Sequence, residues 1–323
     1  MSLLKKDMYI QNLRAISIMA VVLIHILPVC GEAIIIRQFL NFCVAMFLFI
    51  SGYLTNSIID DVKYFYKKRI SRIFIPYIIW SFVFILLSGN YNLKSILARI
   101  LTGQGCGIYY YILVYAQMVI ITPLLIKTLD KRYRRYIYLL TPISILVLYI
   151  LKFLGLEIGF PYNVLSFTVW IIFYYYGLNV RFLERDHKLE NNLYKNIILY
   201  IIFIVLSIIE GFIWNENGDY SMAVSQIKIT SIISSIYFIK VSIGVRNKIK
   251  LKNKLISSIF LLLGDYSFGI YLTHMLFVKI FNKIIPSQIL YVPISLIAIL
   301  LSNCIFIYFL KKILKEKAYL LGF

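Results

Sequence analysis

Apolar residues occur along this chain in long, nearly continuous runs that short polar stretches separate. The runs do not alternate between apolar and polar positions, so they indicate helices and not strands. Most are close to the ~20 residues that an α-helix needs to cross the hydrocarbon core of a bilayer. We therefore predict ten membrane spans, near residues 10–29, 38–56, 73–89, 108–127, 136–154, 164–180, 196–213, 221–242, 265–283 and 289–311.

This pattern predicts an all-α fold, a polytopic transmembrane helical bundle that forms a single domain over residues 1–323. The stretch from Leu255 to Gly264 is too short to span a bilayer, so we expect it either to lie in the interface or to extend the ninth span. The first apolar run lacks a small-residue cleavage site, so we expect a retained span and no cleaved signal peptide. We expect no appended soluble domain after the tenth span.

Composition supports a membrane protein, because 61% of the residues are hydrophobic, well above the ~45–50% of soluble domains. The formal net charge is +20, and the cations concentrate in every second loop. The positive-inside rule explains this bias and places both termini in the cytoplasm. We therefore expect the cations to face lipid headgroups and not nucleic acid. The basic loops include Lys63, Lys67, Lys68, Arg69, Arg72, Lys188, Lys248, Lys250 and Lys252.

The cysteine and histidine residues are not spaced as metal ligands usually are. The four cysteines show no CxxC pair, and the three histidines are far apart in the chain. A zinc site therefore has no support, and we expect no bound metal or cofactor.

Arg14 and His25 lie in the otherwise apolar first span, eleven positions apart. In a helix this spacing returns both side chains to nearly the same face, about 16 Å apart along the axis. Ionisable groups inside a membrane are expensive and mark functional sites. A neutral imidazole can remove a proton from an alcohol, whereas Arg14 can either neutralise an anionic substrate group or reach towards the inner headgroups.

Polar or charged residues at the ends of other spans are further candidates. Ser51 precedes Gly52 in the second span, where we favour close helix packing over a nucleophilic serine. Arg69 and Arg72 share a face at the start of the third span, either as ordinary membrane anchors or as a clamp for a phosphorylated cytosolic ligand. Tyr110 and Tyr111 open the fourth span, where we favour an interfacial aromatic belt over sugar stacking.

Three more sets of residues complete the candidates. Glu210 and Lys228 are intramembrane charges of the seventh and eighth spans, and the sequence leaves open whether they pair. The segment from Leu262 to Phe277 brings Asp265, Ser267, Tyr271 and His274 into the ninth span. We expect His274 to lie inside the membrane and His187, in a charged loop, to be solvated.

Four motifs, read in order, resemble the acyltransferase family 3 of integral membrane proteins. They are Arg-x10-His within LRAISIMAVVLIH, FLFISGYL in the second span, KKRISRIFIPYIIW before and within the third, and GDYSFGIYLTH in the ninth. The resemblance extends from about Asp7 to Leu310. The sequence departs from the family at Tyr110-Tyr111-Ile112, where members usually have Trp-Phe-Leu. This change bears on the identity of the acceptor more than on catalysis.

The resemblance implies a bacterial inner-membrane O-acyltransferase, most simply an O-acetyltransferase. Its donor would be a cytosolic acyl-CoA and its acceptor a cell-surface glycan or lipid-linked sugar. It implies that His25 is the catalytic base or acyl relay, with Arg14 as its partner motif residue. It also implies that Arg69 and Arg72 meet the donor, and it places His274 at a recurrent family position. Charged residues inside the membrane and aromatic residues at the ends of spans are also compatible with two other classes of protein. One is a transporter or flippase for polysaccharide intermediates, and the other is a membrane module that only binds ligand.

Overall fold

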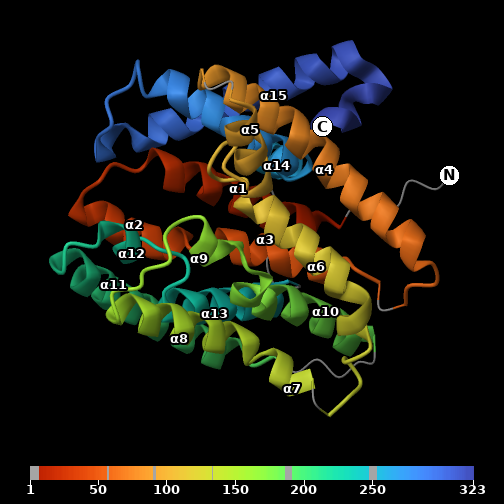
Figure 1. Ribbon diagram of the computed structural model, residues 1–323, viewed down its shortest axis with the longest axis vertical. Coiled ribbons are helices and arrows are strands. Elements are labelled where there is room, and N and C mark those ends of the chain that lie inside the picture. Colours follow the sequence, from red (N-terminus) through yellow and green to blue (C-terminus); the bar gives the residue numbers. More distant parts are fainter. Residues whose placement is uncertain (1–6, 57, 90–91, 133, 186–190, 247–252) are drawn as a thin grey trace. The chain divides into compact units, whose positions relative to one another are not determined.

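The computed structural model of the chain describes residues 7–56, 58–89, 92–132, 134–185, 191–246 and 253–323 (Figure 1). Helices make up 79% of the structure, and the described residues contain no strand. The predicted all-α class is therefore confirmed. His187, Lys188, Lys248, Lys250 and Lys252 lie outside the described residues.

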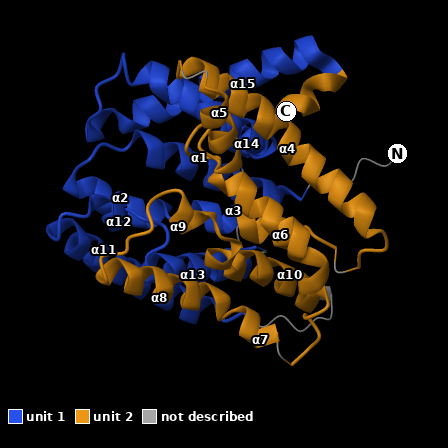
Figure 2. Cartoon of the chain, viewed as in Figure 1, with its two compact units in different colours: residues 1–47, 190–315, 323 blue, residues 48–189, 316–322 orange. Residues whose placement is uncertain are grey.

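The chain forms two compact units, which Figure 2 distinguishes by colour. Unit 1 contains residues 1–47, 190–315 and 323, and unit 2 contains residues 48–189 and 316–322. Each unit is described by itself below. The single domain expected from the sequence stays a prediction.

Unit 1 is built from helices of both ends of the chain. They are α1 (Met8–Ile26), α2 (Gly31–Leu40), the first part of α3 (Phe42–Tyr53), α11 (Leu193–Glu216), α12 (Tyr220–Ala223), α13 (Ile229–Val245), α14 (Lys254–Phe281), the short η2 (Ile289–Tyr291) and α15 (Val292–Leu314). Polar residues start the long helices, because a side-chain oxygen at the N-cap satisfies free backbone N–H groups. The Asp7 carboxylate accepts from the Tyr9 and Ile10 amides, and Asn253 caps α14 in the same way.

Helices α1 and α14 pack side by side and run in the same direction. At one end Gly264 lies against Gln11, so closely that a Cβ on Gly264 would clash with the Gln11 backbone. Further along both helices His25 lies against His274. Small residues permit such close approach between membrane helices. The parallel direction agrees with the prediction that these helices are the first and ninth spans, both odd-numbered.

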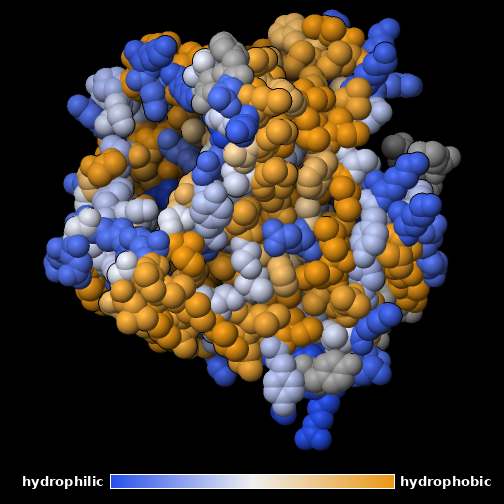
Figure 3. All heavy atoms as spheres, in the orientation of Figure 1, coloured by the Kyte–Doolittle hydropathy of each residue, from blue (hydrophilic) through white to orange (hydrophobic). Residues whose placement is uncertain are grey.

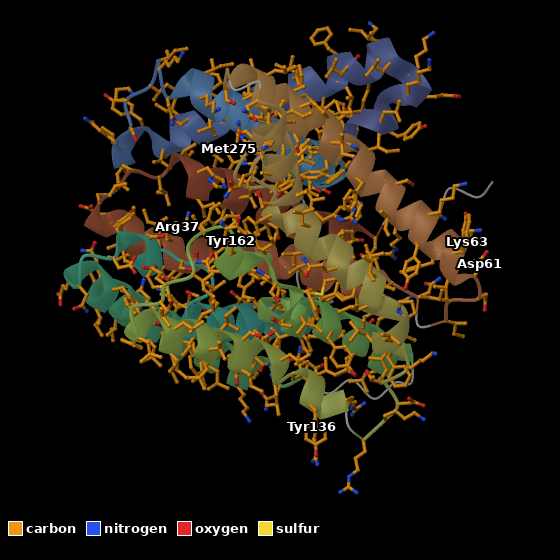
Figure 4. All side chains as sticks on the ribbon, viewed as in Figure 1. Arg37, Asp61, Lys63, Tyr136, Tyr162 and Met275 are labelled. Atoms are coloured by element: carbon orange, nitrogen blue, oxygen red, sulfur yellow. The ribbon has the colours of Figure 1, made fainter. Side chains whose placement is uncertain are left out.

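Unit 2 contains the middle of the chain. Its elements are the end of α3, α4 (Val62–Leu87), α5 (Leu93–Leu101), α6 (Tyr110–Ile126), α7 (Arg134–Ile137), α8 (Leu140–Phe153), α9 (Tyr162–Leu165), η1 (Phe167–Val169), α10 (Ile171–Arg185) and most of η3 (Lys315–Leu321). Asp61 caps α4 by accepting from the Tyr64 amide, and Figure 4 labels Asp61 and Lys63 at this end of the helix. The basic stretch before the predicted third span is thus helical and continuous with it.

Two glycines allow α3 and α10 to cross in close contact. A Cβ on Gly52 would clash with the carbonyl group of Tyr174, and a Cβ on Gly177 would clash with the backbone of Phe49 and Tyr53. Each glycine therefore faces the backbone of the other helix. The packing role that we favoured for the Ser51-Gly52 pair has a direct structural basis at Gly52.

Seven helices of the described chain are long and apolar enough to cross a membrane. Two shorter apolar helices, α6 and α13, occupy the predicted fourth and eighth spans. The total of ten spans and the cytoplasmic termini stay predictions. The ambiguous stretch 255–264 belongs to α14, so it extends the ninth span. Hydrophobic residues gather over α8 on the face shown in Figure 3, where Leu146, Val147 and Ile150 are exposed.

The region of the predicted sixth span, near residues 164–180, is not one continuous helix. Helix α9 ends at Leu165, and α10 starts only at Ile171. Side chains take the backbone groups that a helix would have paired: Gln117 donates to the Leu165 carbonyl and accepts from the Phe167 amide. Thr141 in turn donates to the Thr168 carbonyl. Irregular backbone at membrane depth is tolerated where protein groups satisfy it.

The region of the predicted eighth span, near residues 221–242, is also interrupted. A non-helical stretch, residues 224–228, separates α12 from α13. Its neighbourhood supplies alternative partners for the backbone, because polar side chains of α2 bind the carbonyl groups of Ala223 and Val224. The break itself carries Ser225, Gln226 and Lys228, three polar residues within a predicted span.

Candidate functional site

Arg14 and His25 lie on one continuous helix, α1, as the sequence predicted. His25 occupies the last turn, where free carbonyl groups end the helix. Both side chains are partly buried. Their spacing of eleven residues separates them by about 16 Å along the axis, so they serve different ends of any site that they share.

His274 of α14 lies beside His25, with the two ring centroids 5.5 Å apart and the planes tilted by 41°. The Nδ1 atom of His274 is 2.9 Å from the Ile270 carbonyl oxygen and 3.0 Å from that of Tyr271. A carbonyl only accepts, so Nδ1 carries the hydrogen. The Nε2 atom then has a free lone pair, and it is buried without a hydrogen-bond partner among the described residues.

The His25–His274 pair is thus a buried site with an available proton acceptor. His274 is completely buried, and the Tyr271 ring lies 6.4 Å from it. Figure 4 labels Met275, the next residue of α14. The expected position of His274 inside the membrane stays a prediction. A buried polar atom without a partner is unfavourable in a folded protein and calls for a functional explanation.

Arg37 of α2 connects the end of α1 to the break before α13 (Figure 4). Its Nη1 donates to the Ile24 carbonyl at 2.8 Å, and Nε and Nη2 donate to the Val224 carbonyl at 3.3 and 3.1 Å. A cation is favourable beside the free carbonyls at a helix C-terminus. Its charge acts electrostatically on His25. Arg37 was not among the candidate site residues that the sequence indicated.

Lys228 is completely buried in a polar cluster between α2, α11 and α13. Its Nζ donates to Gln38 Oε1 at 2.8 Å and to the Ser207 and Ala223 carbonyls at 3.0 Å. These three bonds match the three hydrogens of an ammonium group. Gln38 also accepts from Ser207 Oγ at 2.8 Å. Buried polar groups of this kind must be satisfied, and the bonds of Lys228 stabilise the packing of three helices.

Glu210 of α11 lies at the N-terminus of α13. It accepts from the Thr230 hydroxyl and the Thr230 amide, and from the Trp214 indole at 3.3 Å. A carboxylate is stabilised at this end of a helix by the macrodipole. Its charge also acts on Lys228, so the two residues interact electrostatically. This geometry accounts for both charges structurally, and their predicted place in a substrate pocket stays a prediction.

In unit 2, Arg69 and Arg72 differ in their surroundings although both lie on α4. Arg69 is partly buried, donates to the Tyr115 hydroxyl and to the Leu54 carbonyl, both at 3.2 Å, and stacks over the Phe65 ring. Arg72 is exposed. Arg69 is therefore oriented by its neighbours, whereas Arg72 is open to an anionic ligand.

The tyrosines at the start of α6 make aromatic contacts within unit 2. The Tyr110 ring centroid lies 5.8 Å from that of Phe160 and 6.4 Å from that of Trp170, and Tyr111 stacks on Tyr115. The Trp170 indole is itself paired, because its Nε1 donates to the Val164 carbonyl at 2.8 Å. Ser51 is partly buried, and its carbonyl accepts from the Thr55 hydroxyl.

The structure therefore brings together His25, Tyr271 and His274 within unit 1. Glu210 and Lys228 belong to a different cluster, in which each has hydrogen-bond partners of its own. Besides Arg37, the sequence analysis missed Gln38 and Asn41. A signal was present, because Arg37, Gln38 and Asn41 are polar residues within one apolar stretch at spacings of one and four, which place them on neighbouring faces of a helix.

Comparison with known proteins gives one family match. A family model described as an acyltransferase domain matches residues 7–310, nearly the whole chain. No curated protein matches the sequence. No solved structure matches it.

Proposed function

The chain belongs to this family of acyltransferases, and on that premise we propose that it is a membrane O-acyltransferase that moves an acyl group, most simply acetyl, from a cytosolic acyl-CoA to an extracytoplasmic glycan or lipid-linked sugar. The observation that carries the proposal is the buried His25–His274 pair on two parallel helices. Histidine is the commonest general base in enzymes. The apolar helices support a multi-pass membrane protein, which we place in a bacterial inner membrane.

The proposed reaction needs one base. His25 removes the proton from an acceptor hydroxyl, and the oxygen attacks the thioester carbonyl of the donor. The C–S bond then breaks, the ester forms, and the His25 imidazolium returns its proton to the leaving thiolate, so free CoA results. The Nε2 lone pair of His274 accepts a hydrogen bond from a protonated His25 or from the hydroxyl. A general base contributes about 10²–10⁴-fold to the rate.

The donor's phosphates would bind Arg69 and Arg72. A guanidinium matches phosphate oxygens with two parallel hydrogen bonds. The partners of Arg69 hold its planar group in one orientation, which lowers the entropy lost on binding. No cofactor takes part in this scheme, and acyl-CoA is the co-substrate.

The test is replacement of His25 in a deletion strain that carries the gene on a plasmid. His25→Ala should lower the acylation of surface polysaccharide by about 10²-fold or more, measured by NMR of the purified polysaccharide, at an unchanged level of protein in the membrane. His187→Ala is the matched control, because His187 is the remaining histidine of the chain, and it should acylate normally. Near-normal acylation by His25→Ala would overturn the proposal.

The same strains separate an acyltransferase from an exporter of polysaccharide intermediates. With an acyltransferase, the deletion strain keeps its surface polysaccharide and lacks only the acyl groups. With an exporter, the polysaccharide itself is lost from the surface or accumulates inside. An immunoblot of surface and cell-associated polysaccharide gives the answer.

A further inference from the structure

The non-helical stretch 224–228 is held in place by Arg37 and Gln38 of α2, by Asn41 at the C-terminal cap of α2, and by its own Lys228. Gln38 Nε2 and Lys228 Nζ bind the Ala223 carbonyl, Arg37 binds the Val224 carbonyl, and Asn41 Nδ2 binds the Ser225 carbonyl at 3.2 Å. Interrupted helices whose backbone is satisfied by neighbours form substrate sites in many membrane proteins. Specific hydrogen bonds therefore stabilise the break, and the polar side chains around it are candidates for binding a ligand.

Two amide oxygens beside this stretch have no hydrogen-bond partner among the described residues. They are Asn41 Oδ1 and Gln226 Oε1, and both atoms are buried. Asn41 is only 1% exposed, and the two hydrogens of its Nδ2 have three acceptors at 3.2 Å, Gln38 Oε1, the Ser225 carbonyl and Ser231 Oγ. The Gln226 amide nitrogen is 3.5 Å from Cys43 Sγ. Both side chains are thus fixed by their nitrogen atoms, and each presents an oxygen that only a hydrogen-bond donor can satisfy.

Arg37 places this pair of acceptors near His25. It binds the carbonyl of Ile24, the residue before His25, and the carbonyl of Val224, two residues before Gln226. One guanidinium group therefore joins the end of α1 to the stretch 224–228, and Cys43, at the start of α3, contacts the Gln226 amide of the same stretch.

We propose that Asn41 and Gln226 form a subsite that binds the hydroxyl groups of a sugar acceptor and presents one hydroxyl to His25. A sugar is rich in hydroxyl donors, and two neutral amide oxygens match hydroxyl groups, whereas a phosphorylated group would need cations or N–H donors. The subsite rests on the proposed function, since it names where that reaction's acceptor binds. Asn41 and Gln226 are binding residues in this proposal and not catalytic ones.

Binding is tested without turnover, in full-length His25→Ala protein in lipid nanodiscs. The probes are p-nitrophenyl glycosides of glucose, galactose and N-acetylglucosamine, and saturation-transfer NMR measures their Kd. Gln226→Leu removes the acceptor at similar size and should raise the Kd about tenfold, the effect of one hydrogen bond. Gln226→Glu keeps an acceptor and should bind within about threefold of the parent. Asn217→Leu, an exposed amide of the same unit, is the control and should bind as the parent does.

The possible results separate the subsite from the proposed function. Unchanged binding by Gln226→Leu and Asn41→Leu would overturn the subsite, because an ordered water would then explain the free oxygens, and His25 could still be the base. Binding of no glycoside by the parent would also overturn it. Loss of binding in Gln226→Leu, with wild-type protein that transfers no acetyl group from acetyl-CoA to any glycan, would leave the subsite standing and reject the proposed function. Thermal unfolding of each variant identifies any loss that comes from misfolding.

Discussion

His25 and His274 face each other across the contact between two parallel helices, with ring centroids 5.5 Å apart. The two residues are far apart in sequence, and each lies in an apolar segment. The Nδ1 atom of His274 is occupied by its own helix, so only Nε2 is available for function. The arrangement is that of a base with a second group that orients it or shares its proton.

Replacing His274 by Asn should distinguish the role of its Nδ1 atom from that of its Nε2 atom. The Asn amide can still donate to the Ile270 and Tyr271 carbonyls, but nothing replaces Nε2. We expect kcat for acetyl transfer to fall about tenfold or more, a smaller loss than the ~10²–10⁴-fold from removing a general base. The KM for acetyl-CoA and the midpoint of thermal unfolding should stay unchanged. A purely structural His274 would give the opposite pattern, a lower unfolding midpoint with normal kcat.

The sequence predicted the helices well, because long apolar runs can cross a membrane only as helices or barrels. It also selected His25 and His274 as intramembrane ionisable residues. It could not place one against the other, since contacts between distant segments depend on packing and not on local pattern. The close approach at Gly264 and Gln11 that permits this pairing leaves no trace in the periodicity of either helix.

The helix breaks at 166–170 and 224–228 were not predicted from the sequence, for a related reason. The first break lies in a largely apolar run, whereas the second contains Ser225, Gln226 and Lys228. What ends the helix is a competing set of partners, Gln117 and Thr141 for the first break and residues of α2 for the second. Such competition between tertiary hydrogen bonds and the helix ladder cannot be read from one segment alone.

Gly52 and Gly177 should tolerate no side chain, because each faces the backbone of the other helix. Gly52→Ala and Gly177→Ala should each destabilise the protein by about 1–3 kcal/mol, the range for overpacking. Gly31→Ala is the matched control, since Gly31 is also helical and has open space around its Cα. Thermal unfolding in detergent should show lower midpoints for the first two variants and an unchanged midpoint for the control. Equal midpoints for all three would contradict the close crossing of α3 and α10.

Arg69 and Arg72 should differ in how their loss affects the enzyme. Arg72→Ala removes an exposed cation, so it should raise the KM for acetyl-CoA about tenfold, the effect of one charge-assisted hydrogen bond, with no change in stability. Arg69→Ala should raise the KM and also lower the unfolding midpoint, because Tyr115 and the Leu54 carbonyl lose their partner. Tyr115→Phe isolates the second effect, since it keeps the Arg69 charge. Lys67→Ala, an exposed cation of the same helix, is the control for general charge loss and should leave the KM unchanged. A KM that rises equally in Lys67→Ala and Arg72→Ala would show that the donor senses only the overall positive charge and that the arginine pair is no specific clamp.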